Sequence, residues 1–235
     1  DSTLVLKYTS SYGEEGFTGE VTITVVYNWT DDNELVIDYF ATTNKKTIIN
    51  LTHHAFFSLT GIANPTPTVD NLICQINSDF YLPTDATNIP TGEILKVEGT
   101  PFDFRTPKAI GTDFVKGDAE IIAAGGGYDH NWCLNTKGNQ EEICATMTDS
   151  RSGIKLEMYT NEPGVQCYTA NFQDGTRPGK GGIMYQKHCA ICLESQKYPD
   201  SPNKFTLPGW ENSNAFVTPE KPYHSYCKYK FSIVE

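Results

Sequence analysis

Hydrophobic and polar residues alternate along much of the chain with a period of two. The runs Val21–Trp29 (VTITVVYNW) and Glu34–Thr42 (ELVIDYFAT) are rich in β-branched and aromatic residues. Such residues favour strands, in which successive side chains point to opposite faces of a sheet. The segment TDDN between the runs has the composition of a turn. The two runs therefore predict a β-hairpin.

Similar strand-like runs continue through the rest of the chain, separated by clusters of Gly, Pro, Asn and Asp. They are LICQINSDFYL, EEICATMTD, GIKLEMYTN, VQCYTANF, CAICLES and YCKYKFSIV. We find no amphipathic helix of ordinary length. Many short strands with frequent turns are typical of an antiparallel sandwich or barrel, so we predict an all-β fold. The 235 residues contain no linker composition, and we expect residues 1–235 to form one domain.

The charge of the chain argues against two classes of partner. It has 18 Lys and Arg against 29 Asp and Glu, a formal net charge of -11 at pH 7. The resulting field repels phosphate backbones and anionic lipid surfaces. No apolar run approaches the roughly 18 residues that span a bilayer. We therefore expect no nucleic-acid partner and no membrane partner.

The seven cysteines form an odd and scattered set. This fits reduced thiols in the cytoplasm better than a disulfide framework. Only Cys189 and Cys192 have a C-x-x-C spacing, and no second pair completes a zinc site. We expect a cytoplasmic protein with no bound metal. The N-terminus DSTLVLKYTS lacks the pattern of a signal peptide, and a removed leader would leave no trace in it.

Common catalytic signatures are absent from the sequence. It contains no G-x-S-x-G elbow, no P-loop, no G-x-G-x-x-G between strand and helix, and no H-E-x-x-H. These motifs mark serine hydrolases, nucleotide-binding proteins and zinc proteases. Any chemistry must therefore come from scattered polar groups.

Four places set an ionisable or amide side chain within an apolar or aromatic stretch: the pair His53-His54, Asp129, Gln166 and Glu194. Most have a structural alternative. A histidine in a strand is more often a half-buried packing residue, Asp129 can cap a turn, and Gln166 can bond a neighbouring loop. Glu194 is harder to explain, because a carboxylate at the end of CAICL is costly to bury unless it is paired or functional. Strand alternation allows only one histidine of the pair to face a given pocket.

Longer motifs occur in a fixed order along the chain. They are YTSSYGEEGFTGEVTITVVY, NLTHHAFFSLTG, YLPTDATNIPTGEILKVEGTPFDFR, GYDHNWCLN, EPGVQCYTANFQDG and CLESQKYPDSPN. In these motifs the chain resembles the aldose 1-epimerases, or galactose mutarotases, almost from end to end. Their combination is much more specific than any single motif.

The resemblance implies a large antiparallel β-sandwich, in agreement with the strand pattern. It also implies an enzyme that interconverts the α and β anomers of a free hexose, such as galactose or glucose, without a cofactor or metal. By motif position, His54 of NLTHH matches the general acid that protonates the ring oxygen. Glu194 of CLES matches the base that takes the proton from the anomeric hydroxyl. Asp129 of GYDHN matches a carboxylate that holds sugar hydroxyls, and Gln166 of GVQ matches a polar site residue.

The chemistry of ring opening accounts for these residue types. One group must remove the proton from O1 while another delivers a proton to O5, and a carboxylate and a histidine suffice. Sugars also pack their C–H faces against aromatic rings. The candidates for that contact, most of which we expect in the core, are Phe56, Phe57, Trp132, Tyr168 and Phe172.

The chain departs from the family pattern at its N-terminus. Members carry about 100 further residues before the YGEEGFTGE motif, enough for several more strands, including an arginine and an N-x-x-H-x-G-G segment that enter the site. The missing part could be a separate chain, the protein could be a natural minimal form, or it could be a remnant that binds sugars without turnover. We favour a separate chain, because Glu194, His54 and Asp129 keep their full motif context. An uncovered sheet edge would otherwise expose apolar core.

Two functions compete with hexose mutarotation. The first is non-catalytic carbohydrate binding, or a subunit that is active only with a separate N-terminal chain. The second is epimerisation of hexose 6-phosphates, which should require a cationic clamp for the phosphate. The arginines are Arg105, Arg151 and Arg177, and none lies in a site motif.

Overall fold

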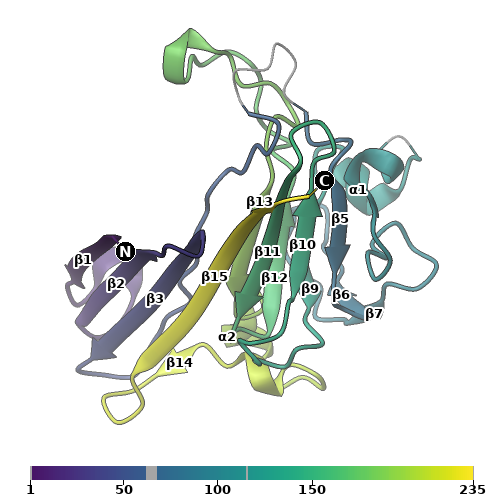
Figure 1. The fold of residues 1–235 in the computed structure, drawn as a ribbon. Coiled ribbons are helices and arrows are strands. Elements are labelled where there is room, and N and C mark those ends of the chain that lie inside the picture. Colours follow the sequence, from purple (N-terminus) through teal and green to yellow (C-terminus); the bar gives the residue numbers. More distant parts are fainter. Residues whose placement is uncertain (1, 62–67, 115, 235) are drawn as a thin grey trace.

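β-strands dominate the architecture, as the alternating pattern predicts (Figure 1). The computed structural model describes residues 2–61, 68–114 and 116–234. The larger sheet has eight antiparallel strands in the spatial order β1-β2-β3-β15-β11-β10-β5-β8. Their bounds are β1 Ser2–Ser10, β2 Val21–Trp29, β3 Glu34–Thr43, β15 Tyr223–Ile233, β11 Ile154–Thr160, β10 Ala145–Thr148, β5 Ile73–Ile76 and β8 Lys108–Ala109.

A smaller sheet packs on the larger one and has five antiparallel strands in the order β13-β12-β9-β6-β7. Its bounds are β13 Cys192–Gln196, β12 Gly164–Tyr168, β9 Asp129–Cys133, β6 Phe80–Leu82 and β7 Leu95–Lys96, and a separate two-stranded sheet pairs β14 Phe216–Val217 with β4 Thr47–Ile48. The helices are short: α1 Ala119–Ala123, α2 Ser201–Lys204 and the 3-10 turns Glu14–Gly16, Ile110–Asp113, Lys180–Gly182 and Glu211–Ser213. In the described ranges no helix is long and apolar enough to cross a bilayer. The predicted all-β sandwich is confirmed.

The predicted hairpin is present, with β2 and β3 paired from Val21↔Thr43 to Trp29↔Leu35. The run LICQINSDFYL differs from expectation, because it forms two strands in different sheets, β5 and β6. Its polar centre explains the break. The Ser78 hydroxyl donates to the carbonyl oxygen of Phe80 at 2.6 Å, and the Asn77 amide bonds to the carbonyl of Cys144. These bonds turn the chain from one sheet to the other.

The core lies between the facing sides of the two sheets. Trp132 of β9 is fully buried there, and its indole N–H donates to the carbonyl oxygen of Phe102 at 2.9 Å. The Tyr229 hydroxyl of β15 donates to the carbonyl oxygen of Leu193 at 2.6 Å. This bond joins the larger sheet to the smaller one. The core therefore fixes the smaller sheet by one face and leaves its other face free.

The first three strands continue the larger sheet away from the main body of the fold (Figure 1). Pairing of β1 with β2 puts Leu4 opposite Tyr27 and Leu6 opposite Val25. Tyr27 and Val25 pack against the core, but Leu4 is 55% exposed and Leu6 is 49% exposed. The apolar side of the sheet thus runs outward onto β1, where the described chain leaves it uncovered.

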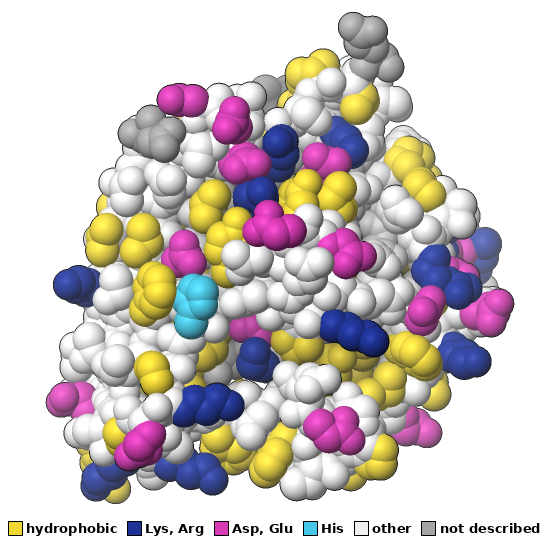
Figure 2. Space-filling model, turned by 60° about the horizontal axis from the view of Figure 1, so that its bottom comes forward, with side chains coloured by type: hydrophobic (Ala, Val, Ile, Leu, Met, Phe, Trp, Pro, Cys, Tyr) yellow, Lys and Arg dark blue, Asp and Glu magenta, His cyan; other side chains and the backbone are white. Residues whose placement is uncertain are grey.

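Charged side chains are scattered on the face of the molecule shown in Figure 2. Acidic, basic and hydrophobic groups are interspersed there, and this face carries no broad patch of positive charge.

The core position of Trp132 gives a test of the packing. We expect Trp132→Ala to lower the free energy of unfolding by about 3–5 kcal/mol, because it removes a buried ring and leaves a cavity. Phe172→Ala is the matched control. Phe172 is 61% exposed, so its loss should change the free energy by no more than about 0.5 kcal/mol. Urea unfolding measures both, and equal effects would contradict the assignment of the core.

Candidate functional site

The free face of the smaller sheet carries a row of polar residues across three strands. Glu194 of β13 lies opposite Gln166 of β12, and Gln166 lies opposite Asn131 of β9. In each strand, the side chains next to these residues in the sequence point to the opposite face of the sheet, where they are buried in the core. These core residues are Leu193, Ser195, Val165, Cys167, His130 and Trp132. One face of these strands thus supports the fold, and the other presents functional groups.

Neighbouring rows on the same face complete the polar surface. Tyr168 lies opposite Cys192 on one side and Asp129 on the other. Gly164 occupies the row on the other side, and a Cβ atom there would lie 2.6 Å from the Oδ1 atom of Asn131. Glycine at this position therefore leaves room for the amide side chains next to it.

His54 reaches this surface from the segment that follows β4. The segment is tied to the edge of the smaller sheet at both ends. Its Phe57 exchanges two backbone hydrogen bonds with Ile191, at 2.8 and 2.9 Å, and the Asn50 side chain bonds to the backbone of Lys197 at 3.0 and 2.9 Å. The residues between Asn50 and Phe57 belong to no strand.

The two adjacent histidines point in opposite directions even though they lie outside a regular strand. The ring of His53 packs between those of Tyr27 and Tyr229, with centroids 5.7 Å away in each case. Its pKa is lowered, chiefly by burial. The ring of His54 instead turns to the polar face and packs at 5.1 Å from Phe56. Of the two, His54 is therefore the one that lies on the polar face.

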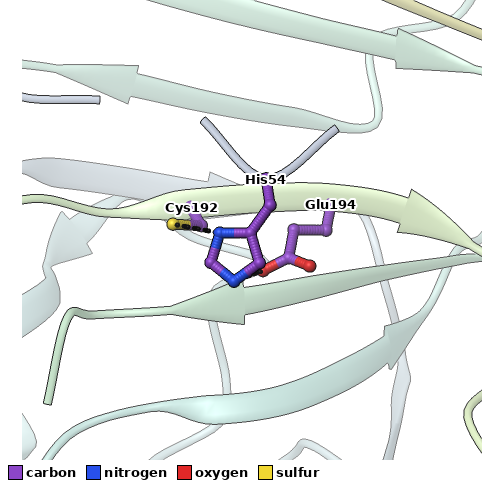
Figure 3. Close-up of side chains that lie close together, drawn as sticks. All are labelled: His54, Cys192 and Glu194. Carbon is purple, nitrogen blue, oxygen red and sulfur yellow. Dashed lines mark hydrogen bonds and ion pairs between the residues drawn. The ribbon is translucent and has the colours of Figure 1, made fainter. Parts of the chain in front are cut away.

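Two groups flank the His54 ring at its two nitrogens (Figure 3). The Nε2 atom lies 3.5 Å from the Oε1 atom of Glu194, and the Nδ1 atom lies 3.4 Å from the Sγ atom of Cys192. The side chain of His54 is 52% exposed, whereas that of Glu194 is 9% exposed. A buried carboxylate is therefore in contact with an accessible imidazole.

Burial raises the pKa of Glu194 to about 7. His54 opposes this shift by favouring the ionised form, and the nearby carboxylate of Asp129 adds to it. Burial also raises the pKa of Asp129, although a hydrogen bond from Gln166 and the charge of His54 each act to lower it. Two carboxyl groups thus share a poorly solvated region, and Glu194 can change protonation state near neutral pH.

A chain of amides holds Asp129. The Nε2 atom of Gln166 donates to the Oδ1 atom of Asp129 at 2.8 Å. Gln196 donates to the Oε1 atom of Gln166 at 3.3 Å and to the Oδ1 atom of Asn131 at 3.2 Å. Sequence reasoning missed Gln196 and Asn131. Their spacing could have identified them, because each lies two residues after a candidate carboxylate and therefore on the same face of its strand.

All four candidate residues, His54, Asp129, Gln166 and Glu194, line one cavity of about 470 Å³. Its volume is in the range of small-molecule sites. The described residues that line it include no Lys or Arg: they are His54, Phe56, Thr84, Asn88, Pro90, Asp129, Asn131, Gln166, Tyr168, Glu194, Gln196 and Pro199. Two larger hollows, of about 770 and 790 Å³, have no histidine among their described lining residues.

Two of the five aromatic candidates line the cavity, Phe56 and Tyr168. The ring of Phe172 stacks on that of Tyr168, with centroids 6.3 Å apart. Phe57 and Trp132 instead pack in the core. Phe56 and Tyr168 therefore supply the aromatic surface of the cavity.

In the described ranges, one group of side chains brings its ligand atoms close enough together to consider a metal ion. It consists of Cys192, His54 and Glu194, whose ligand atoms lie within 4.8 Å of one another. Their arrangement does not suit a single ion. The thiol faces one nitrogen of the ring and the carboxylate faces the other, and one imidazole nitrogen binds one ion. The geometry instead fits a proton-transfer site.

Known proteins are similar in sequence to nearly the whole length of this chain. Residues 1–230 match the family model described as aldose 1-epimerase. The chain belongs to the aldose 1-epimerase family. Over 221 residues it is 42% identical to the galactose mutarotase of Mus musculus, and over 231 residues it is 36% identical to the aldose 1-epimerase of Escherichia coli (strain K12).

These alignments cover most of this chain but a smaller share of each relative. They include 94% and 98% of this chain but only 60% and 64% of the mouse and bacterial proteins. The chain thus spans about 60% of the length of the curated relatives it matches. The resemblance to the aldose 1-epimerase family is confirmed.

Solved structures share the fold. The crystal structure of the GalM/aldose epimerase homologue from C. elegans superposes with a TM-score of 0.85 at 26% identity, over 99% of this chain and 66% of the other. A galactose 1-epimerase structure from Lactobacillus acidophilus NCFM gives a TM-score of 0.82 at 24% identity, over 99% of this chain and 63% of the other. The family fold and the sandwich described above are therefore the same.

The raised pKa of Glu194 has a consequence for stability. The folded protein keeps the Glu194 proton up to about pH 7, whereas the unfolded chain loses it near its ordinary pKa of about 4.3. The folded state thus binds more protons between these values, and this group's contribution to stability falls as pH rises through that window. We expect Glu194→Gln to remove this slope and to raise the free energy of unfolding at pH 8 by roughly 1–3 kcal/mol.

Urea unfolding of parent and variant at several pH values measures that difference. Glu220→Gln is the matched control, since Glu220 is exposed and lies outside the cavity lining. It should leave the pH dependence unchanged. Parallel curves for the parent and Glu194→Gln would contradict the raised pKa.

Proposed function

We propose that this chain carries the catalytic site of an aldose 1-epimerase that interconverts the α and β anomers of a free hexose such as galactose or glucose. The observation that supports this most directly is the pairing of Glu194 with His54, at 3.5 Å, on the floor of the cavity. Ring opening needs a base and an acid at two oxygens bonded to the same carbon. Adjacent proton-transfer groups meet that requirement.

In the proposed mechanism the Glu194 carboxylate takes the proton from the O1 hydroxyl while His54 delivers a proton to the ring oxygen O5. The bond from C1 to O5 breaks, and the electron pair from O1 forms the aldehyde. Rotation about the bond from C1 to C2 then presents the other carbonyl face. Attack by the O5 hydroxyl, with both proton transfers reversed, closes the ring as the other anomer. A glutamate with a pKa of about 7 suits both directions.

We assign substrate binding to Asp129 and Gln166. A carboxylate accepts hydrogen bonds from sugar hydroxyls, and an amide both donates and accepts. Gln166 also orients Asp129 through the 2.8 Å bond between them. The rings of Phe56 and Tyr168, with an interplanar angle of 79° and centroids 6.1 Å apart, offer faces for the C–H groups of the sugar. This set favours an uncharged polyhydroxylated ligand.

A hexose 6-phosphate fits the cavity less well, since no Lys or Arg is among its described lining residues. Two arginines are held elsewhere by carboxylates. Arg105 bonds to Asp103 at 2.8 Å, and Arg151 bonds to Asp149 at 3.0 Å. Neither provides a clamp for phosphate at this site.

We also propose that further polypeptide, most simply a separate chain, covers the apolar side of β1. The exposed Leu4 and Leu6, together with Tyr8 at 54% exposure, support this, because contiguous exposed apolar surface on an edge strand is a docking or aggregation site. The seven free buried cysteines support a reducing, cytoplasmic location.

Polarimetry of freshly dissolved α-D-galactose and α-D-glucose tests the proposed function. We expect the chain to accelerate mutarotation, and Glu194→Gln to reduce the rate at least about 100-fold, the usual contribution of general base catalysis. The parent rate should rise with pH through about 7 as Glu194 ionises. Glu220→Gln should keep the parent rate. A Glu194→Gln rate within tenfold of the parent would contradict the role of Glu194.

If the chain alone does not accelerate mutarotation, sugar binding separates the remaining alternatives. Saturable binding of galactose or glucose, seen by ligand NMR and weakened in Asp129→Asn, would indicate a binding protein or a subunit that needs a partner. The absence of both binding and turnover would overturn the proposal for this cavity.

The histidine pair gives a second test. We expect His54→Ala to lower kcat about 100-fold or more, because it removes the proposed acid, with little change in stability at this exposed position. His53→Ala should lower the free energy of unfolding instead, because its ring packs between Tyr27 and Tyr229. Parallel rate and thermal unfolding measurements separate these effects. The opposite pattern would exchange the two assignments.

A further inference from the structure

The ladder between β6 and β9 stops just before the residues that reach the cavity. Its last pair joins Leu82 to Asn131. The next pair in this register would join Thr84 to Asp129, since each lies two residues beyond the last pair. Both residues line the cavity. The backbone N–H groups of Thr84 and Asp129 therefore need acceptors other than each other's carbonyl groups.

Two side chains provide these acceptors. The N–H group of Thr84 donates to the Oε2 atom of Glu120, in α1, at 3.3 Å. The N–H group of Asp129 donates to the Nδ1 atom of His130 at 3.1 Å. The Nε2 atom of His130 in turn lies 3.6 Å from the Oε2 atom of Glu120. Glu120 and His130 thus bridge the two backbones at the point where the ladder has ended.

The tautomer of His130 follows from this arrangement. Its side chain is fully buried, and burial lowers its pKa to about 4, so the ring is neutral at pH 7. A neutral imidazole that accepts at Nδ1 carries its proton on Nε2, the atom that faces Glu120. At 3.6 Å this contact is longer than an ordinary hydrogen bond, and it acts as an attraction between the N–H group and the carboxylate. The Tyr81 hydroxyl donates to the other oxygen of Glu120 at 2.9 Å and orients it.

We propose that Glu120 and His130 are positioning residues that set the separation of Thr84 and Asp129 and so hold the Asp129 carboxylate where it meets the sugar. Neither residue is among the described lining of the cavity, so both act through the backbone. The effect on sugar binding rests on the proposed function, whereas the hydrogen bond at Asp129 is independent of it. The proton-transfer groups Glu194 and His54 lie on other segments, so we expect the effect on KM rather than on kcat.

NMR tests the hydrogen bond directly. We expect a through-bond coupling between the amide nitrogen of Asp129 and the Nδ1 atom of His130 in the parent protein at pH 7, with the imidazole proton on Nε2. Glu120→Ala should weaken the coupling, because the tautomer with the proton on Nδ1 is then no longer disfavoured. A parent spectrum without the coupling would overturn the proposal, and an unchanged coupling in Glu120→Ala would overturn the role of Glu120.

Kinetics test the consequence for the sugar. We expect His130→Leu, which removes the acceptor and keeps an apolar side chain in the core, to raise KM about 3- to 10-fold, the effect of losing one modest hydrogen bond. The change in kcat should stay below about twofold. His130→Asn should recover most of the loss, because its amide oxygen can accept near the position of Nδ1.

Cys167→Ala is the matched control. Cys167 lies opposite His130 on β12 and is also buried, so its loss disturbs the same layer of the core without removing the acceptor. It should leave KM unchanged. An equal rise of KM in Cys167→Ala, or no rise in His130→Leu, would overturn the proposed role.

If the parent chain does not catalyse mutarotation, the dissociation constant of galactose measured by ligand NMR replaces KM in the same comparison. A parent that neither binds nor converts the sugar would count against the proposed function and against this role in sugar binding. The coupling would still decide whether His130 holds the backbone of Asp129, so the two failures are distinguishable.

Discussion

The site depends on the two-sidedness of three neighbouring strands, β9, β12 and β13. One face of each strand supplies the sandwich core, including Trp132, and that burial fixes the backbone. The same backbone carries the side chains of the other face, so these side chains are held in place without having to stabilise the sheet themselves. A buried carboxylate such as Glu194 is unfavourable on its own, and it is held in place because the apolar side chains beneath it stabilise the sheet. The core thus compensates for the unfavourable environment that raises the pKa of the glutamate.

Much of the fold was readable from the sequence, because alternation is a local property. The hairpin of β2 and β3 follows from its composition, and the all-β class from the number of short runs. The split of LICQINSDFYL into two strands could not be read in the same way. Its break depends on bonds from Ser78 and Asn77 to groups that only the folded chain brings near.

The candidate site was also predictable from the sequence only in part. Glu194 is conspicuous as a charge at the end of an apolar run, whereas the choice of His54 over its neighbour came from resemblance to a family. The alternation of side chains along a strand predicts that the two histidines point to opposite faces, but it does not predict which of them enters a cavity. Gln196 and Asn131 were missed because their importance comes from pairing register, which aligns β13, β12 and β9 across the sheet. Register depends on the hydrophobic patterns of the paired strands and on the turns that join them, and it is not visible in one strand alone.

Glu194 lies on the outermost strand of the smaller sheet, and the segment that carries His54 runs along that open side. The two proposed proton-transfer groups therefore belong to separate structural modules, one rigid and one joined to it by a few bonds at Asn50 and Phe57. The segment is anchored to Tyr229 of the larger sheet by His53 and Phe57, whereas His54 between them faces the cavity. This modularity would allow the acid to be repositioned or exchanged while the base and the sugar-binding amides stay where they are.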